Sequence, residues 1–303
     1  MTTATVCVPH CDTPWFLKAC LESIAAHQHH DLDIDVIVAC QTQDHAMHKQ
    51  VYGIIAASPL KVKLLHCRLL GCGHGIDEAL RFATGEYFCT LDCDAWPIHK
   101  NWLWVPVRLI ADGHAQWVGS DTGLALSYKE KGHFVHLNNY YRVSRTDVAR
   151  TVSRNVGFIR WDSRWEVDFH AKDYYWESLG GTVKCDNGVV AMHHTRDHKK
   201  ISLPILRCLG RAPSGIYGMV IEDLVFHLVF ARNRLQNEDP AKAYGKDYLE
   251  LYDAMQKHGV SRDDITLLVK TANDGIWVGD FRKLDGNSVS DDLNKRIEET
   301  KQS

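Results

Sequence analysis

The chain has 303 residues and a formal net charge of −3 at pH 7, so no basic excess indicates a nucleic-acid partner. Hydrophobic residues make up 45% of the chain and charged residues 24%. This composition excludes a disordered chain and supports a substantial buried core.

The cysteines and the most apolar run bear on location. Ten cysteines are spaced singly with no CxxC pair, which is typical of reduced thiols. The first residues lack the charged stretch and the following apolar stretch of a signal peptide, so we expect a cytoplasmic protein. The run 215–231 is interrupted by acids and His227, and a bilayer-spanning helix needs about 20 apolar residues. We therefore expect a packed core helix there and no transmembrane segment, with peripheral membrane contact as the alternative.

Strands and helices alternate along the first hundred residues. Apolar runs predict strands, and apolar residues at helical spacing predict the helices between them. The expected strands are 3–9, 34–40, 60–67 and 86–92, and the expected helices are 13–27, 44–58 and 74–85. This alternation predicts an α/β fold with a mostly parallel, Rossmann-type sheet that is flanked by helices.

The pattern changes beyond Pro97. The expected elements are helices at 101–113, 145–153 and 171–181, strands at 115–128 and 133–144, and a strand or hairpin at 182–194. From about residue 200 the pattern is mostly helical. We therefore expect one domain over residues 1–200 and a mainly helical extension over residues 201–303.

Two acids follow the fourth strand. Asp92 and Asp94 come directly after the apolar run EYFCTL, at the strand end where open α/β sheets bind ligands. Paired carboxylates favour a divalent cation, and Mg²⁺ or Mn²⁺ often shares its shell with substrate phosphates. The same D-x-D spacing in DLDID, residues 31–35, begins a strand and predicts a solvated turn. Near it, His27, His29 and His30 form a cluster of potential metal ligands, for which a solvated surface is the expected use.

Three blocks of sequence resemble a glycosyltransferase of the family-2 type with the GT-A nucleotide-sugar fold. The first is ATVCVPHCDTPWFLKACLESI, with an opening strand, a proline loop and a helix. The second is GCGHGIDEALRFATGEYFCTLDCDAWP, which contains the A-x-G-E-Y step and the D-x-D strand end. The third is AKDYYWESLGGTVKCDNGVVAMHH, with an acid-bearing helix and a segment that ends in histidine.

The resemblance implies a metal-dependent, inverting transfer from a nucleotide-diphosphate sugar to a carbohydrate or other hydroxyl acceptor. Residues 1–200 would form the catalytic domain. By position, Asp92 would lie near the donor's ribose or sugar, and Asp94 would bind Mn²⁺ or Mg²⁺. Either His193 or His194 would be a further metal ligand.

The resemblance also places a catalytic base on a late helix. Asp173 falls at that position, where a carboxylate would accept the proton of the acceptor hydroxyl. The alternatives are Glu166, Asp168 and Glu177. Trp96, directly after the acids, is the expected acceptor contact because carbohydrate faces pack well on aromatic rings.

The expected donor contacts include departures from the family pattern. Pro9 and Cys93 are expected to contact the donor, while Asp12 and Asp77 stand where the family usually has asparagines. The family's second strand usually ends in acids that hold the nucleotide base, but this chain has Ala39 and Cys40 there. The remaining polar candidates at that strand end are Thr42 and Asp44.

Two rival functions remain open. A nucleotidyltransferase that makes a sugar nucleotide would need a glycine-rich, basic loop after the first strand, but the chain has PHCDTPW there. A non-catalytic nucleotide- or sugar-binding relative is favoured by the altered end of the second strand. The acids at residues 92, 94 and 173 oppose that reading.

Overall fold

The structure is a computed structural model of the chain. It describes residues 1–68, 71–121, 137–158, 161–162, 184–185, 189–203, 205–211 and 215–228. The predicted base Asp173, its three alternatives and the extension beyond residue 228 lie outside these ranges.

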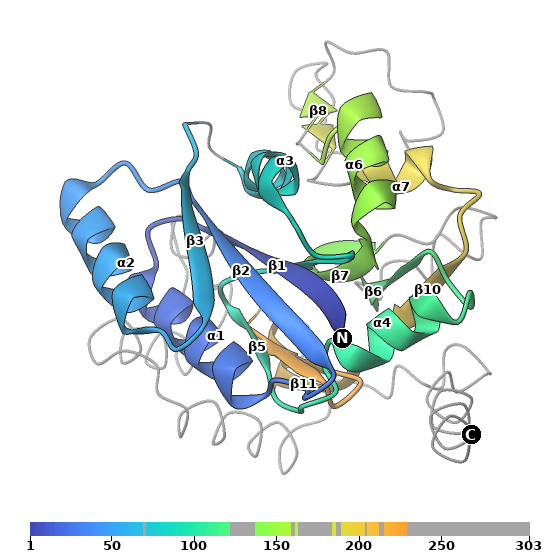
Figure 1. The fold of residues 1–303 in the computed structure, drawn as a ribbon, viewed down its shortest axis with the longest axis horizontal. Helices are drawn as coiled ribbons and strands as arrows, with labels where there is room; N and C mark the ends of the chain where they lie inside the picture. Colours follow the sequence, from blue (N-terminus) through green and yellow to red (C-terminus); the bar gives the residue numbers. More distant parts are fainter. Residues whose placement is uncertain are drawn as a thin grey trace.

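A seven-stranded sheet forms the centre of the molecule, with the strand order β10-β6-β7-β4-β1-β2-β3 (Figure 1). Its strands are β1 (Thr2–His10), β2 (Leu32–Cys40), β3 (Lys61–His66), β4 (Tyr87–Leu91), β6 (Trp117–Asp121), β7 (Leu137–Arg145) and β10 (Lys200–Leu203). β7 runs antiparallel to both of its neighbours, and the other pairs are parallel. β4 is buried at every position, as expected for a strand covered on both faces.

Helices cover both faces of this sheet. The helices are α1 (Pro14–Ala26), α2 (His45–Ala57), α3 (Cys72–Phe82), α4 (Trp104–Ala111), α6 (Thr146–Asn155) and α7 (Val189–His194). One apolar cluster joins α1, α2 and α4 to the sheet, and a second joins α3, α6 and α7 to its opposite face (Figure 1). This layering confirms the predicted α/β fold class.

A smaller antiparallel sheet follows the order β11-β12-β13-β5. Its strands are β5 (Ala95–Pro97), β11 (Ile205–Arg211), β12 (Gly215–Ile221) and β13 (Val225–His227). Because β5 starts directly after Asp94, this sheet extends from the end of β4. A further pair joins β8 (Trp161–Asp162) and β9 (Lys184–Cys185).

The expected core helix over residues 215–231 is wrong, because β12 and β13 form a hairpin there. Ile221 pairs with Val225 across a three-residue loop, in which Glu222 and Asp223 take left-handed φ angles of 47° and 54°. The Leu224 N–H donates to the Ile221 carbonyl at 2.8 Å and closes the turn. The sequence did not indicate this turn, because neither left-handed residue is the usual glycine or asparagine and the residues on both sides are apolar.

The segment before β4 shows why Gly85 stands in the A-x-G-E-Y step. A Cβ atom at residue 85 would lie 2.5 Å from the backbone of Ala4, so only glycine fits beside β1. The Thr5 hydroxyl accepts from the N–H groups of Thr84 and Gly85, at 3.1 and 2.9 Å. These contacts fix where β4 begins and therefore where it ends.

The predicted boundary at residue 200 falls where β10 joins the main sheet. Beyond it, β13 pairs with β5, so described strands on both sides of residue 200 share hydrogen bonds. The domain division itself stays a prediction. Among the described residues, no helix is both long enough and apolar enough to cross a bilayer.

Candidate active site

The turn after β4 brings Asp92 and Asp94 to the carboxyl end of the main sheet. The Asp92 N–H donates to the Tyr140 carbonyl on β7 at 3.1 Å, and the Ala95 N–H donates back to the Asp92 carbonyl at 2.9 Å. The turn holds both carboxylates beside the strand end, half-buried, with the Asp94 side chain 15% exposed. The sequence position of the pair predicted this location.

His227 completes the group. β13 pairs with β5 so that His227 lies opposite Ala95, and the Leu228 N–H donates to the Asp94 carbonyl at 2.9 Å. The His227 Nε2 atom lies 3.5 Å from Asp94 Oδ1. One ligand atom from each of Asp92, Asp94 and His227 lies within 4.8 Å of the others.

The imidazole of His227 is held in place by Tyr140. The two rings stack with their centroids 4.2 Å apart and their planes 16° apart. The Tyr140 hydroxyl pairs with the Ser120 hydroxyl at 3.0 Å, so the supporting ring is itself fixed. Within the part of the chain that the structure describes, His227 Nδ1 is buried without a hydrogen-bond partner. The other ring nitrogen, Nε2, is the one that faces Asp94.

This group fits a divalent cation. Two half-buried carboxylates that lie close together repel each other unless a positive charge balances them. Adjacent ligand atoms about 2.1 Å from a cation lie about 3 Å apart. The 3.5 Å between His227 Nε2 and Asp94 Oδ1 therefore needs little adjustment. A carboxylate-rich set with one imidazole suits Mn²⁺.

The group of described residues around Asp94 contains His227 and does not contain His194. His194 is exposed at the end of α7, with its Nε2 3.4 Å from the Asn155 amide nitrogen, and it is absent from the group around Asp94. The prediction of a strand ending in paired histidines is wrong, because residues 189–194 form a helix. The side chain of His193 lies outside the described residues.

The loops after β1 and β2 meet at the same edge. Asp12 has a left-handed φ of 56°, which turns its carboxylate toward the second loop. The Thr42 hydroxyl donates to Asp12 Oδ1, and the Cys11 thiol donates to Oδ2 at 3.3 Å. Pro9 is buried on β1 opposite Ala39. Thus Pro9, Asp12 and Thr42 lie together, as a shared donor site requires.

A groove of about 580 Å³ opens beside these loops at the ends of β2 and β3. Its lining includes no acid and is rich in imidazoles and cations. The lining residues are Cys40, Thr42, Gln43, His45, His48, Lys49, Tyr52, His66, Cys67 and Arg68. The Tyr52 hydroxyl and His66 Nε2 are 2.8 Å apart, and the His48 and His66 rings lie 4.9 Å apart. Sequence reasoning missed this groove because its residues are spread over a strand end, a helix and a loop.

Two further candidates make structural contacts. The Asp44 carboxylate caps α2 by accepting from the Met47 N–H at 2.8 Å. Asp77 accepts from the Ser153 hydroxyl at 2.6 Å and from the Phe158 N–H at 3.0 Å, which ties α3 to the end of α6. Burial raises the pKa of Asp77 above its usual value, against the lowering effect of these bonds. Donor contacts by Asp44 and Asp77 stay predictions.

Trp96 and Cys93 lie inward of the site. Trp96 is fully buried and packs on Phe16 and Phe226, with ring centroids 6.0 and 5.8 Å away. This burial favours a packing role for the ring, and its contact with an acceptor stays a prediction. The Cys93 thiol lies 3.5 Å from the Thr13 hydroxyl, and burial raises its pKa well above the usual value. A neutral Cys93 that touches the start of α1 has a packing role, and a donor contact stays a prediction.

The chain belongs to glycosyl transferase family 2, whose sequence profile matches residues 5–159. The family resemblance expected from the sequence is thereby confirmed, and the matched region includes both Asp92 and Asp94. His227 lies beyond it. No curated protein matches the chain.

Solved structures of two glycosyltransferases are similar to part of the chain. Glucosyl-3-phosphoglycerate synthase from Mycobacterium tuberculosis, in complex with Mn²⁺, UDP and glucosyl-3-phosphoglycerate, is 16% identical with a TM-score of 0.38. TarS residues 1–349 from S. aureus, in complex with UDP-GlcNAc, is 17% identical with a TM-score of 0.39. The matches cover 48% and 52% of this chain, and 58% and 48% of those chains.

Proposed function

We propose that the protein transfers a glycosyl group from a nucleotide-diphosphate sugar to an acceptor hydroxyl, with a divalent cation bound by Asp92, Asp94 and His227. Membership of glycosyl transferase family 2 supports the reaction class. The single observation that carries the proposal is the convergence of these three ligands at the carboxyl end of the sheet.

The donor would lie along this edge. β2 is two strand spacings from β4 and β3 is three, so the groove at the ends of β2 and β3 lies roughly 10–14 Å from β4. A nucleotide that spans this distance would place its base against Tyr52 and His66 and its diphosphate near Asp94. Cations at Lys49 and Arg68 favour an anionic ligand in the groove. Asp12 and Thr42 lie between the two ends and would contact the ribose.

Transfer forms a bond from the acceptor oxygen to the anomeric carbon and breaks the bond from that carbon to the diphosphate. The diphosphate leaves with the electron pair, and the acceptor hydroxyl loses its proton. When bound, the cation would supply a Lewis acid beside the leaving diphosphate. Asp92 and Asp94 would position the cation, and with it the donor's diphosphate, at the carboxyl end of the sheet. The Tyr140 ring, which stacks on His227, would keep the imidazole directed at the same cation.

The proton acceptor is assigned on the family pattern alone. We propose Asp173 for this role and inversion at the anomeric carbon, with Glu166, Asp168 and Glu177 as the alternatives. A carboxylate that accepts the proton as the new bond forms contributes about 10²–10⁴-fold to the rate. Asp173→Asn should therefore lower transfer by that factor while donor binding stays near that of the wild type.

The test of the proposal is nucleotide binding with and without metal. Calorimetric titration of nucleoside diphosphates in Mn²⁺ should show binding that EDTA weakens and that Asp94→Ala removes. The control is His114→Gln, at an exposed residue after α4. Equal affinity of the wild type with Mn²⁺ and with EDTA would overturn the metal assignment.

Slow hydrolysis of nucleotide sugars separates an enzyme from a binding protein. A transferase should release free nucleoside diphosphate from at least one sugar nucleotide in a panel, in a Mn²⁺-dependent manner. Tight binding without release from any member of the panel would instead support a non-catalytic relative.

A further inference from the structure

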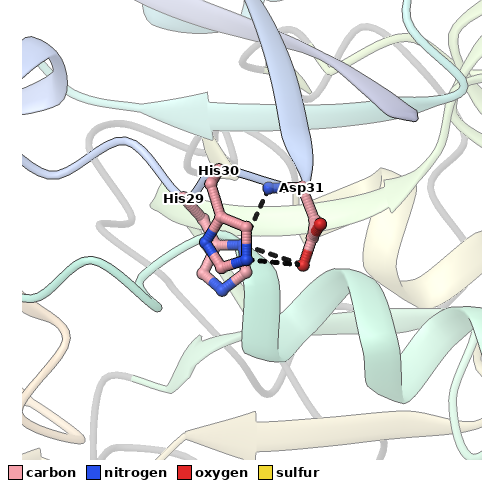
Figure 2. A group of neighbouring side chains, drawn as sticks. All are labelled: His29, His30 and Asp31. Atoms are coloured by element: carbon pink, nitrogen blue, oxygen red, sulfur yellow. Dashed lines mark hydrogen bonds and ion pairs between the residues drawn. The ribbon is translucent and has the colours of Figure 1, made fainter.

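A second group of metal-binding side chains lies at the opposite end of the sheet. His29, His30 and Asp31 follow one another in the turn between α1 and β2 (Figure 2). One ligand atom from each lies within 4.8 Å of the others. The glycosyltransferase site uses none of these residues.

His29 is a fixed ligand. Its side chain is 9% exposed, and its ring lies flat on Trp104 at the start of α4, with the centroids 4.6 Å apart and the planes 4° apart. The His30 ring covers the other face at 4.4 Å. Because Trp104 supports the His29 ring, this imidazole loses little further freedom when it binds a cation.

The other two donors face His29 from solvent. Asp31 Oδ2 lies 3.2 Å from His30 Nε2 and 3.8 Å from His29 Nδ1, and Figure 2 shows the carboxylate turned toward both rings. Tetrahedral ligands about 2.1 Å from a cation lie about 3.4 Å apart. His30 is 80% exposed and Asp31 is 53% exposed. The His30 ring can therefore turn off the His29 ring and direct its Nε2 at a shared cation, and Asp31 can follow it at little cost.

The backbone already selects the required tautomer of His29. The Asp31 N–H donates to His29 Nδ1 at 3.2 Å, which leaves the proton of a neutral ring on Nε2. The Nδ1 lone pair therefore points toward Asp31, on the side where the carboxylate stands. A cation would take the place of this single N–H as the partner of Nδ1.

We propose that His29, His30 and Asp31 bind a borderline-soft divalent cation such as Zn²⁺, at a structural site that orders the α1–β2 turn where His29 packs on Trp104. Two imidazoles and one carboxylate suit Zn²⁺ better than Mg²⁺ or Mn²⁺. Water would complete the tetrahedral shell. The proposal does not depend on the glycosyltransferase assignment.

One neighbouring charge opposes this site and provides a diagnostic variant. The Lys100 ammonium acts electrostatically on His29. A cation at the site would be repelled by this ammonium. Removal of the charge by Lys100→Gln should therefore tighten Zn²⁺ binding by roughly threefold at low salt.

The test is a Zn²⁺ titration of the full chain against a chromophoric chelator, in an Asp94→Asn background that disables the other group. His30→Gln/Asp31→Asn should weaken one Zn²⁺ equivalent by at least about 100-fold, because loss of an outer contact alone costs 10–100-fold. His114→Gln, at an exposed histidine outside the group, should leave the affinity unchanged. Equal affinity in the double variant and its parent would overturn the proposal.

Thermal unfolding gives a second readout. Because His30 and Asp31 are exposed, the double variant should unfold at the same temperature as its parent in EDTA. Zn²⁺ should raise the melting temperature of the parent, since ligand that binds only the folded state stabilises it. An equal rise in the double variant would contradict the site.

Discussion

The two ligand groups at opposite ends of the sheet differ in how they are assembled. Asp92, Asp94 and His227 come from the end of β4 and from a distant hairpin, and the Asp94 and His227 side chains are 15% and 6% exposed. His29, His30 and Asp31 are consecutive, and two of them are largely exposed. The first group exists only when the small sheet has formed, whereas the second needs only one turn and a tryptophan beneath it.

This difference explains why burial matters more than spacing in judging such sites. Shielded carboxylates destabilise the fold unless a cation or another donor balances them. Exposed side chains carry almost no such cost, because water solvates them in any arrangement. The low exposure of the group around Asp94 therefore supports a bound cation. For the group around His29, only the geometry of the side chains supports one.

The largest expected effect is the difference in stability between variants of Trp96, at the carboxyl end of the sheet, and Trp104, at the amino end. Trp96→Ala should destabilise the protein by about 3–5 kcal/mol, because it empties a fully buried position between Phe16 and Phe226. Trp104→Ala should cost less, since Trp104 is only partly buried. Chemical denaturation of both variants measures the difference. Equal losses would show that the amino end is packed as tightly as the carboxyl end.

Exchange of single histidines sharpens the comparison of the ligand groups. His227→Gln should weaken Mn²⁺-dependent nucleotide binding by about 10–100-fold, because it removes one of three converging ligands. His30→Gln should leave that binding unchanged. His194→Gln should also have no effect, since His194 contacts Asn155 instead. Calorimetry in Mn²⁺ provides the readout, and a loss in His194→Gln with none in His227→Gln would reverse the assignment.

A smaller loss of stability is expected at Asp77, a predicted donor contact whose carboxylate ties α3 to the end of α6. Asp77→Ala should cost about 1–3 kcal/mol, because the Phe158 N–H and the Ser153 hydroxyl lose their acceptor. Asp77→Asn keeps one carbonyl oxygen and should cost less. Denaturant unfolding measures the stability, and nucleotide titration is the parallel control. Weakened nucleotide binding in a stably folded Asp77→Asn variant would restore the donor contact expected from the sequence.

The main sheet was predictable because its pattern is local. Apolar strands alternate with amphipathic helices, and a turn signal separates most of them, as at Pro14 and Gly85. The Asp92–Asp94 pair was found for the same reason, since an apolar run leads directly into it. Both inferences needed only neighbours in the sequence.

The third ligand was not predictable in this way. The position of His227 depends on the register between β13 and β5, which are far apart in the sequence. The same apolar run also fits a buried helix, and its hairpin turn at Glu222 and Asp223 carries no glycine. The burial of Trp96 was not predictable either, because the sequence beside an aromatic residue does not tell toward which face the strand turns its side chain.

The hairpin that supplies His227 also sets an order of events in the cell. A ribosome releases the acids at residues 92 and 94 long before it releases β12 and β13, and domains form as their segments emerge. A growing chain therefore presents two carboxylates without their histidine, and the proposed three-ligand group would be complete only after the late hairpin has docked on β5. Binding of a cation by this group would then report that translation has passed the hairpin and that its strands have paired.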